Sequence, residues 1–443
     1  MKHPFLLVHA SLFALCLVGG AAAHAESMTE AVAQALQQHP SVIAAIANRN
    51  ALSEERREYV SDYFPELNLS LGTGRLYADN STSRGLSVTR GVGYSWINEG
   101  NISLRQTIFD GFETNNRVDA ATARQSSAHL QIMDVRETLA MRAIASYLEV
   151  MRNQETLGKL KAHNAKLDDY IKRIELMVDE GVVDESMAAQ ARDVRAQLKS
   201  TEATVEGLLA SAMSDYNEVI GHEPETVLEK PAGMMDIIEP DVEKAVALAL
   251  QNHPALKAAH FSESAYEHDA NAEKASIYPD LTGEVSYMKR DQADVIGGEA
   301  IDARAMLRVN WVLQTGGEQF ARMKKTQHRQ DEAEARFQER ARQVEKAVRS
   351  SYADLKSSER QVTVLQDRVR LSRDLKRTQE TQFEGARISL LQLMQTENAL
   401  FNSEMSLLNG EYRHLASQYA VLAGIGKLQE SLQLSAAAAS RHE

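Results

Sequence analysis

Two stretches of the chain match one another, Ala31-Val32-Ala33-Gln34-Ala35-Leu36-Gln37-Gln38-His39-Pro40 and Ala245-Val246-Ala247-Leu248-Ala249-Leu250-Gln251-Asn252-His253-Pro254, at an offset of 214 residues. The same offset places Phe64-Pro65-Glu66-Leu67 on Tyr278-Pro279-Asp280-Leu281. Agreement at two separate places in one register is not expected by chance, and the period is too long for a solenoid repeat. The sequence therefore predicts that a domain-sized unit is duplicated.

The duplication predicts how the chain is divided. Pro224, Pro231 and Pro240 cluster between the two copies and mark a linker. The expected parts are a signal peptide over 1–25, a first repeat over 26–221, a linker in an equatorial region over 222–240, a second repeat over 241–426 and a C-terminal tail over 427–443.

The first residues have the pattern of a signal peptide. Lys2 precedes an apolar run over 5–18, and Ala23-His24-Ala25 is a small-residue cleavage site. The run is too short to span a membrane as a helix. The only cysteine, Cys16, lies inside it, so the remaining chain has no thiol for a disulfide or a metal site. We therefore expect an exported protein.

Composition narrows the class of protein further. The formal charge is -13, which gives no electrostatic reason to bind nucleic acid. Aromatic residues make up only 6% of the 443 residues, so large compact cores lack their usual anchors. None of the 8 prolines lies between Pro65 and Pro224 or after Pro279, which leaves two long stretches without the strongest helix breaker.

Each repeat begins with a helix and a pair of strands. Apolar residues at three-and-four spacing predict one helix over 28–62 and another over 241–276. Period-two alternation then predicts strand hairpins over about 66–109 and about 280–314, each with one apolar face. Polar links that contain glycine, about 78–91 and 291–300, are expected to be exposed loops.

A long helical hairpin completes each repeat, over about 113–220 and about 318–424. The first helix of each, 113–178 or 318–383, spans ~100 Å at 1.5 Å per residue. Val348, Leu355 and Val362 recur every seven residues, which is the pattern of a coiled coil. We therefore predict a mainly α fold with a small β part.

Four strands with one apolar face are too few to close a membrane barrel, which needs about eight or more. An open sheet edge in lipid is prohibitively costly, so strands that span a membrane require several chains to share one barrel. Tyr94, Trp96, Tyr287 and Trp311 would then lie in interfacial aromatic belts. The alternative is a soluble sheet that caps a coiled coil, with these aromatic residues in its core.

The repeat opening over 30–40 resembles the signature of TolC-family outer-membrane channels, and Phe109-Asp110-Gly111-Phe112 resembles their strand-to-helix turn. The stretch over 383–393 is similar to the tip of their second helical hairpin. The resemblance implies a homotrimer whose four strands per chain form a 12-stranded barrel in outer-membrane lipid. It also implies a periplasmic α-helical tube, a periplasmic adaptor protein, and an inner-membrane ABC transporter or proton-driven pump.

The resemblance further implies a gate at the periplasmic tips of the hairpins, closed by inward bending and held by polar and ionic links. The candidate gate residues are Gly181, Ser186, Met187, Arg192, Gly385, Arg387, Gln392 and Gln395. Gln392 and Gln395 stand where the family commonly has carboxylates, and Gly385 and Ala386 are in swapped order relative to the usual pattern. Weak block of the pore by divalent cations is therefore expected. Alternatively, the two glutamines only cap helix contacts, and Arg387 is only a solvated tip residue.

The candidate adaptor contacts are Val182, Val183, Ile388, Leu390 and Leu391, which are apolar residues next to exposed turns. They serve either the adaptor or the packing of the hairpins.

No catalytic constellation is evident, and no enzyme activity, cofactor or metal is expected. His39 and His253 recur because the unit is duplicated, and their position before a proline favours a structural role. The favoured function is the exit duct of a type I secretion system that passes a protein such as a large adhesin. The alternatives are the outer-membrane part of a multidrug or small-molecule efflux pump and a secreted trimeric coiled-coil protein.

Overall fold

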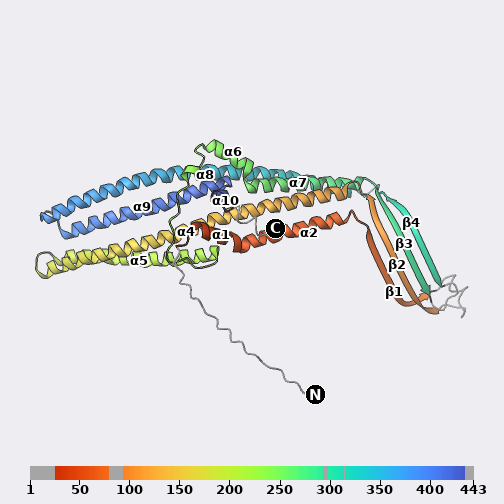
Figure 1. The fold of residues 1–443 in the computed structure, drawn as a ribbon, viewed down its shortest axis with the longest axis horizontal. Helices are drawn as coiled ribbons and strands as arrows, with labels where there is room; N and C mark the ends of the chain where they lie inside the picture. The colour runs from red at the N-terminus through yellow and green to blue at the C-terminus, as the bar shows by residue number, and fades with distance from the viewer. Residues whose placement is uncertain (1–24, 79–92, 293–297, 314, 435–443) are drawn as a thin grey trace, which may run out of the picture.

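The computed structural model describes residues 25–78, 93–292, 298–313 and 315–434. The expected signal peptide up to residue 24, most of the first strand-hairpin loop, residues 293–297 of the second loop and the end of the C-terminal tail lie outside the described residues. The chain is mainly helical with one small sheet, as the sequence predicts, and is extended, with the sheet at one end and the helical hairpin tips at the other (Figure 1). None of the described helices has an apolar stretch long enough to cross a membrane.

The order of elements repeats once along the chain. The first repeat contains α1 (Met28–Gln38), α2 (Pro40–Ser61), β1 (Glu66–Ala78), β2 (Gly93–Phe109), α4 (Glu113–Asp179) and α5 (Glu185–Ile220). The second contains α6 (Val242–Asn252), α7 (Pro254–Lys274), β3 (Asp280–Gln292), β4 (Glu299–Asn310), α8 (Glu318–Glu384) and α9 (Leu390–Ile425). Short helices η1 (Met235–Ile237), η2 (Ala275–Ile277) and α10 (Leu428–Ser431) complete the described chain.

The prediction of one continuous helix at the start of each repeat is wrong. Each is two helices that meet at a His-Pro pair, because proline lacks the N–H that would continue the first helix and favours extended backbone in the residue before it. His39 has φ -67° and ψ 131°, and its Nδ1 accepts a hydrogen bond of 3.1 Å from the Ser41 N–H. His253 caps α7 in the same way, with Nδ1 3.2 Å from the Ala255 nitrogen. The recurrent histidines are therefore N-caps.

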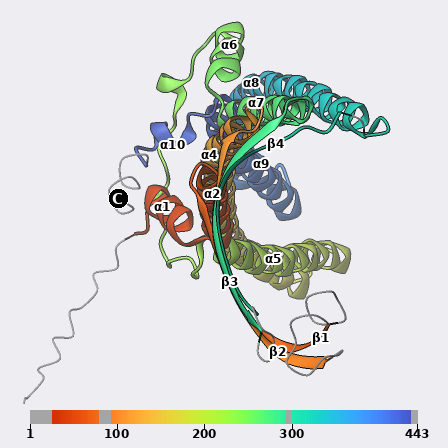
Figure 2. The ribbon, with the colours of Figure 1, turned by 90° about the vertical axis from the view of Figure 1, so that its right-hand side faces the viewer.

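The four strands form one antiparallel sheet in the order β1-β2-β3-β4, so β1 and β4 each have a single neighbour within the described sheet. Figure 2 shows the sheet as one curved layer. The predicted strand alternation runs on to Leu313, but β4 ends at Asn310. Asn310 pairs with Asp280, the first residue of β3 after the Pro279 turn, so the described β3 offers no partner for later residues.

The two long helices, α4 and α8, have 67 residues each and span ~100 Å. Their hairpin partners α5 and α9 have 36 residues each and cover only the half that is distant from the sheet. In the other half α2 packs on α4 and α7 packs on α4 and α8. The long helices thus connect the sheet to the tips as continuous rods.

Tyrosines tie the linker between the repeats to the long helices at mid-length. The Tyr147 hydroxyl is 2.7 Å from the carbonyl oxygens of both Glu26 and Glu229. Tyr352 donates to the Glu239 carbonyl at 2.6 Å. These contacts lie in the larger of two apolar clusters, which contains parts of α1, α4, α6 and α9.

A buried glutamate holds the C-terminal segment against the middle of α4. The Glu137 carboxylate accepts the backbone N–H of Leu428 at 2.5 Å, and its other oxygen accepts the Gln429 side-chain amide at 3.0 Å. Burial raises the pKa of this carboxyl above its usual value. The first residues of the expected tail are therefore part of the fold.

Candidate functional site at the hairpin tips

The first tip joins α4 to α5 through a tight turn. Gly181 has φ +73°, and the next N–H, of Val182, donates to the Met177 carbonyl at 2.8 Å. This closes α4 with the left-handed residue and the six-to-one hydrogen bond of a Schellman motif. Arg192 on α5 then joins the two helices, because its guanidinium is 3.0 Å from Glu175 on α4 and 3.1 Å from Glu185.

The second tip joins α8 to α9 through the same turn with different residues in it. The Arg387 N–H donates to the Gln382 carbonyl at 2.9 Å, so the left-handed position falls on Ala386, with φ +53°. Gly385 stands one residue earlier, with an ordinary φ of -82°. The swapped order seen in the sequence thus gives the strained conformation to a residue with a Cβ, which costs about 1–2 kcal/mol.

The swap predicts opposite effects at the two tips. Ala386→Gly is expected to stabilise the second turn by about 1 kcal/mol and to slow exchange of the Arg387 amide hydrogen roughly fivefold. Gly181→Ala is expected to accelerate exchange of the Val182 amide by a similar factor, although a Cβ there meets no described atom within 4 Å. Hydrogen exchange of both variants measures this, and slower exchange at Val182 in Gly181→Ala would contradict it.

The tips rest on a second apolar cluster that joins the two hairpins. Its members come from α4, α5 and α9 and include Leu167, Ala191 and Met394. Leu390 and Leu391 are buried in this cluster, so within one chain their side chains pack the hairpins together. Val182 is 63% exposed, whereas Val183 and Ile388 are half-buried.

The remaining predicted gate residues lie on the outside of the tips. Gln392 and Gln395 are both exposed on α9, and Ser389 Oγ accepts the Gln392 N–H at 3.2 Å. Arg387 and Ser186 are also exposed, and Met187 packs partly against the cluster.

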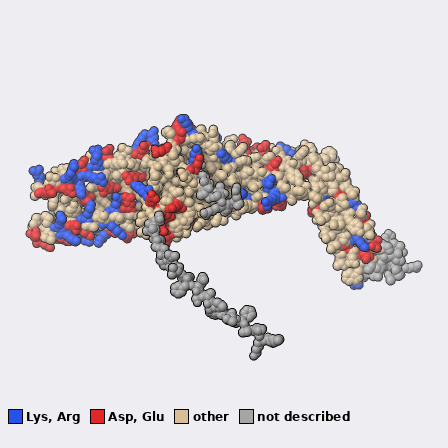
Figure 3. All heavy atoms as spheres, viewed as in Figure 1, with Lys and Arg blue, Asp and Glu red and all other residues tan. Residues whose placement is uncertain are grey.

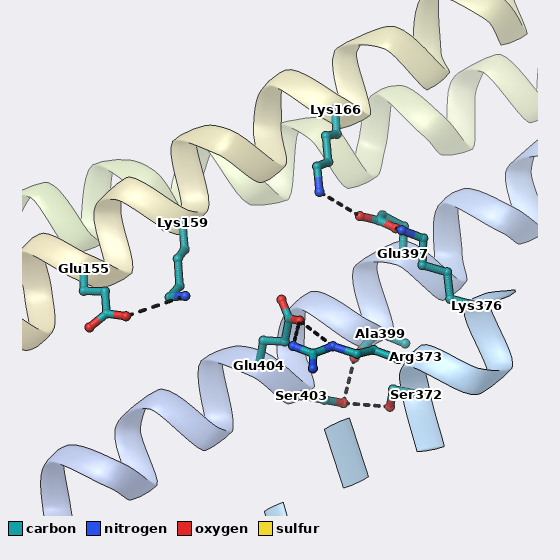
Figure 4. Close-up of polar contacts among 10 residues, drawn as sticks. All are labelled: Glu155, Lys159, Lys166, Ser372, Arg373, Lys376, Glu397, Ala399, Ser403 and Glu404. Carbon is teal, nitrogen blue, oxygen red and sulfur yellow. Dashed lines mark hydrogen bonds and ion pairs between the residues drawn. The ribbon is translucent and has the colours of Figure 1, made fainter. Parts of the chain in front are cut away.

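A buried glutamate links the two hairpins, and the sequence reasoning missed it. The Glu397 side chain on α9 is 5% exposed; its carboxylate lies 2.7 Å from Lys376 Nζ on α8 and 3.6 Å from Lys166 Nζ on α4 (Figure 4). Burial opposes ionisation of Glu397, but the two lysines hold its pKa below the usual value. The signal was present in the sequence, because Glu397 interrupts an otherwise apolar helix face that contains Met394 and Phe401.

A buried histidine adds a second contact between α4 and α9. The His163 ring stacks on Phe401 with centroids 4.1 Å apart, and its Nε2 is 3.4 Å from Asn398 Oδ1. Burial lowers the pKa of His163, an effect that Lys166 reinforces and that Asn398 and Glu397 oppose. The neutral ring is therefore the form that packs between the hairpins.

The lowered pKa of His163 predicts how the stability of the α4–α9 contact depends on pH. An unpacked histidine binds a proton near pH ~6.5, whereas the packed ring resists it. The α4–α9 contact is thus fully present above that pH and weakens as pH falls below it. We expect the protection of amides around Phe401, measured relative to their intrinsic exchange rates at each pH, to decrease as pH falls from about 6.5 to 5, and His163→Phe to reduce this decrease. An unchanged pH dependence of this protection in His163→Phe would show that the protonation of other groups weakens the contact.

The sheet end of the molecule has the chemistry of a lipid-facing surface. Alternate strand residues place exposed apolar side chains on one face, namely Leu67, Leu69, Leu71, Ile102, Leu104, Val285, Leu307 and Val309. On the face in view in Figure 3, few charged side chains lie over the sheet, whereas both signs crowd the tips.

The aromatic residues lie near the limits of this apolar face. Trp96 is exposed beside Arg75, and Tyr287 stands two residues before Lys289 on the same strand face. Trp311 follows the end of β4, and its indole N–H donates to the Ile277 carbonyl at 3.3 Å. Tyr94 pairs with Tyr77 in the ladder. The sequence reasoning missed a further group of exposed aromatic residues where strands meet helices, which comprises Phe64, Phe112, Tyr278 and Phe320.

The described residues contain no group of three or more His, Cys, Asp or Glu side chains that is placed to hold a metal ion. A cleft of about 460 Å³ lies between α4, α7 and α8 near the sheet and is lined mainly by charged side chains such as Arg124 and Asp269.

A sheet with an apolar face, continued by two helices that each span ~100 Å, defines an outer-membrane channel with a large periplasmic part. The sequence model of a family described as outer membrane efflux protein matches residues 31–221 and 245–427. The chain therefore belongs to this family, which is the TolC family of channels. These proteins are channels and not enzymes; they form trimers and work with periplasmic adaptors and inner-membrane transporters.

Individual relatives are distant but match over almost the whole chain. Outer membrane efflux protein BepC of Brucella suis is 22% identical over 96% of this chain and 90% of its own length. Outer membrane protein TolC of Vibrio cholerae is 21% identical over 92% of each chain. The solved structure of the Campylobacter jejuni CmeC outer membrane channel superposes with a TM-score of 0.80 at 13% identity, over 92% of this chain and 89% of that one.

Proposed function

We propose that three copies of this chain form the exit duct of a type I secretion system. The duct would receive a protein substrate, such as a large adhesin, from an inner-membrane ABC exporter through a periplasmic adaptor. The observation that supports a trimer is the sheet. Its four strands have an apolar face, and its two outer edges have backbone N–H and C=O groups that only further strands can pair in lipid. The overall resemblance of the sequence to the type I secretion members of the family favours a protein substrate.

The second candidate is export of small toxic molecules, with a proton-driven or ABC pump. It is favoured by the description of the relative BepC as an efflux protein. Deletion of the gene separates the two functions: loss of one large secreted protein supports secretion, whereas unchanged secretion with increased sensitivity to toxic compounds supports efflux.

We propose that the gate of this channel is held by the contact between α4 and α9. Glu397 forms an ion pair with Lys376 of α8 and another with Lys166 of α4. A movement of the second hairpin away from the first therefore separates Lys166 from Glu397. The Arg192 pairs act within the first hairpin and keep it rigid while this happens.

The glutamines of α9 give an expectation for ion block. Gln392 and Gln395 are exposed and uncharged, so a ring of three copies has no net charge to bind cations. Single-channel conductance with added divalent cation is expected to show weak block, and Gln395→Glu is expected to strengthen it. Strong block of the unaltered channel that disappears in Gln395→Ala would contradict this role.

The adaptor is proposed to contact the exposed part of the tips, where Val182, Val183 and Ile388 lie next to Arg387. Arg387→Glu is the test, because it changes a solvated side chain at the tip and leaves the apolar cluster intact. Loss of export with intact trimers supports the contact, and normal export excludes Arg387 from it.

A further inference from the structure

The cleft near the sheet has an excess of basic side chains in its wall. Its volume is about 460 Å³, and residues of α2, α4, α7 and α8 line it. The chain has a formal charge of -13, yet only three acidic side chains line the cleft, against five basic ones. The positive charge is therefore a local feature of this wall. The basic side chains are Arg117, Arg124, Arg322, Lys325 and Arg329.

Two of these cations have no partner in the chain. Arg117, Arg124 and Arg322 each form an ion pair with a carboxylate. Lys325 and Arg329 are exposed, and within the described residues neither has a hydrogen bond or an ion pair. No acidic residue occurs in the sequence over 319–330 to offset them. Both side chains are therefore free to bind an anion.

Glu273 is the acidic side chain of the cleft that stands without an ion pair in the described part of the chain. The Gln319 side-chain amide donates to the Ser276 carbonyl, and α7 and α8 run in opposite directions. Lys325 and Arg329 therefore lie level with residues 266–270 of α7, roughly 4–10 Å further from the sheet than Glu273 at 1.5 Å per residue. The cleft is thus acidic at its sheet end and basic at the end towards the tips.

The cleft lies on the concave side of the helix layer. α2 packs on α4, α4 on α7 and α7 on α8, so the four helices lie in this order. Tyr59 of α2 and Arg329 of α8 nevertheless line the same cleft, which requires the layer to bend around it. When several chains close a ring, the concave side of each wall faces the lumen.

The polar face of the sheet continues the same side of the wall. A neighbouring cleft of about 260 Å³ shares Arg322 with the first and extends to Asp280 and Asn310. These two residues pair in the ladder, and Asn310 follows Val309 of the apolar face, so it points to the opposite face. On α8 the exposed Phe320 lies ~140–180° around the helix from the two free cations. The cleft therefore faces away from lipid.

We propose that the basic end of this cleft binds carboxylate groups of the exported polypeptide on the inner wall of the duct. Arg329 offers a planar guanidinium that can hold a carboxylate through two hydrogen bonds, and Lys325 offers an ammonium group. One cleft in each copy gives a ring of such sites around the lumen. The proposal rests on the secretion duct proposed above and adds a site at which that duct holds its substrate.

The spacing of the two cations fits an extended acidic segment. Lys325 and Arg329 are four residues apart on one face of α8, which is ~6 Å along the helix axis. Residues i and i+2 of an extended chain point the same way and are ~6.6 Å apart. Two carboxylates at alternate positions of an unfolded substrate can therefore meet both cations at once, whereas a single carboxylate meets only one.

Block of single-channel current tests the site. An alternating Glu-Ser octapeptide, added on the tip side of trimers in a planar bilayer, is expected to reduce the current of the unaltered channel. The Gln-Ser octapeptide of the same length should not block. Lys325→Gln combined with Arg329→Gln should raise the half-blocking concentration roughly tenfold or more, because the charge-assisted hydrogen bonds are lost.

Lys324→Gln is the matched control. Lys324 is exposed, has no ion pair in the described chain, and lies one turn from Phe320 on the side of α8 that does not line the cleft. Its half-blocking concentration should stay within about twofold of that of the unaltered channel. Lys325→Arg keeps the charge and should keep the block. Equal loss of block in Lys324→Gln, or undiminished block in the double variant, would overturn the site.

The small dicarboxylate glutarate distinguishes the source of the carboxylates. It is expected to block less than the Glu-Ser octapeptide, and block at the same concentration would overturn the assignment to an extended polypeptide. If unaltered trimers conduct but the octapeptide does not block them, only this inference fails. If the unaltered chain forms no conducting trimer, the proposed function fails with it.

Discussion

Replacing Glu397 by glutamine is expected to produce a leaky channel. The variant keeps the shape of the side chain but removes the charge that lies between Lys376 and Lys166 in a largely buried site. Because the two lysines keep some access to water, we expect the closed arrangement of the hairpins to lose about 2 kcal/mol, which raises the open population roughly thirtyfold. Resting conductance in a planar bilayer measures this directly.

Glu404→Gln is the matched control for this effect. Glu404 also lies on α9 and pairs with Arg373 of α8 at 2.8 Å, but this pair is more exposed and lies within one hairpin (Figure 4). Exposed pairs contribute about 0–1 kcal/mol, so its conductance should change little. Equal leakage in both variants would show that α9 is sensitive to any charge change and that Glu397 does not hold the gate.

Placing arginine at Leu69 is expected to prevent assembly in the outer membrane. Leu69 is exposed on the apolar face, opposite Ile102 in the ladder, so the added charge would lie in the hydrocarbon region. An arginine near the middle of the bilayer costs about 2–4 kcal/mol, and the assembled channel would carry one in each copy. The amount of trimer in purified outer membranes measures the loss.

Ser70→Arg is the control, because neighbouring residues of a strand point to opposite faces. Ser70 lies opposite Asn101 on the polar face of the sheet. Trimers should therefore form in Ser70→Arg and not in Leu69→Arg. Failure of both variants, or of neither, would contradict the assignment of the apolar face to lipid.

Most of the fold followed from patterns that depend only on neighbouring residues. Period-two alternation and heptad spacing report which face of an element is buried, so the strands and the long helices were predictable. The break at His39 was missed because a proline at the first turn of one helix and a proline bend inside a longer helix have the same local sequence. The end of β4 at Asn310 depended on where its partner strand begins, which alternation alone does not contain.

The candidate site was less predictable because it joins separate segments. Lys166 and Glu397 are distant in sequence and meet only after two long helices are aligned side by side. Tip residues were found by resemblance, but Leu390 and Leu391 belong to the interior of the tip, which their position beside a turn did not reveal. The left-handed conformation of Ala386 follows from the swapped order of two residues, although the sequence alone did not indicate its cost.

The central claim is that several copies of an open four-stranded sheet assemble into one outer-membrane duct. Native mass measurement of the full-length protein, extracted from purified outer membranes with mild detergent, tests it most directly. The account predicts one species with the mass of three chains. A single chain, or a protein recovered from the soluble fraction without detergent, would contradict it.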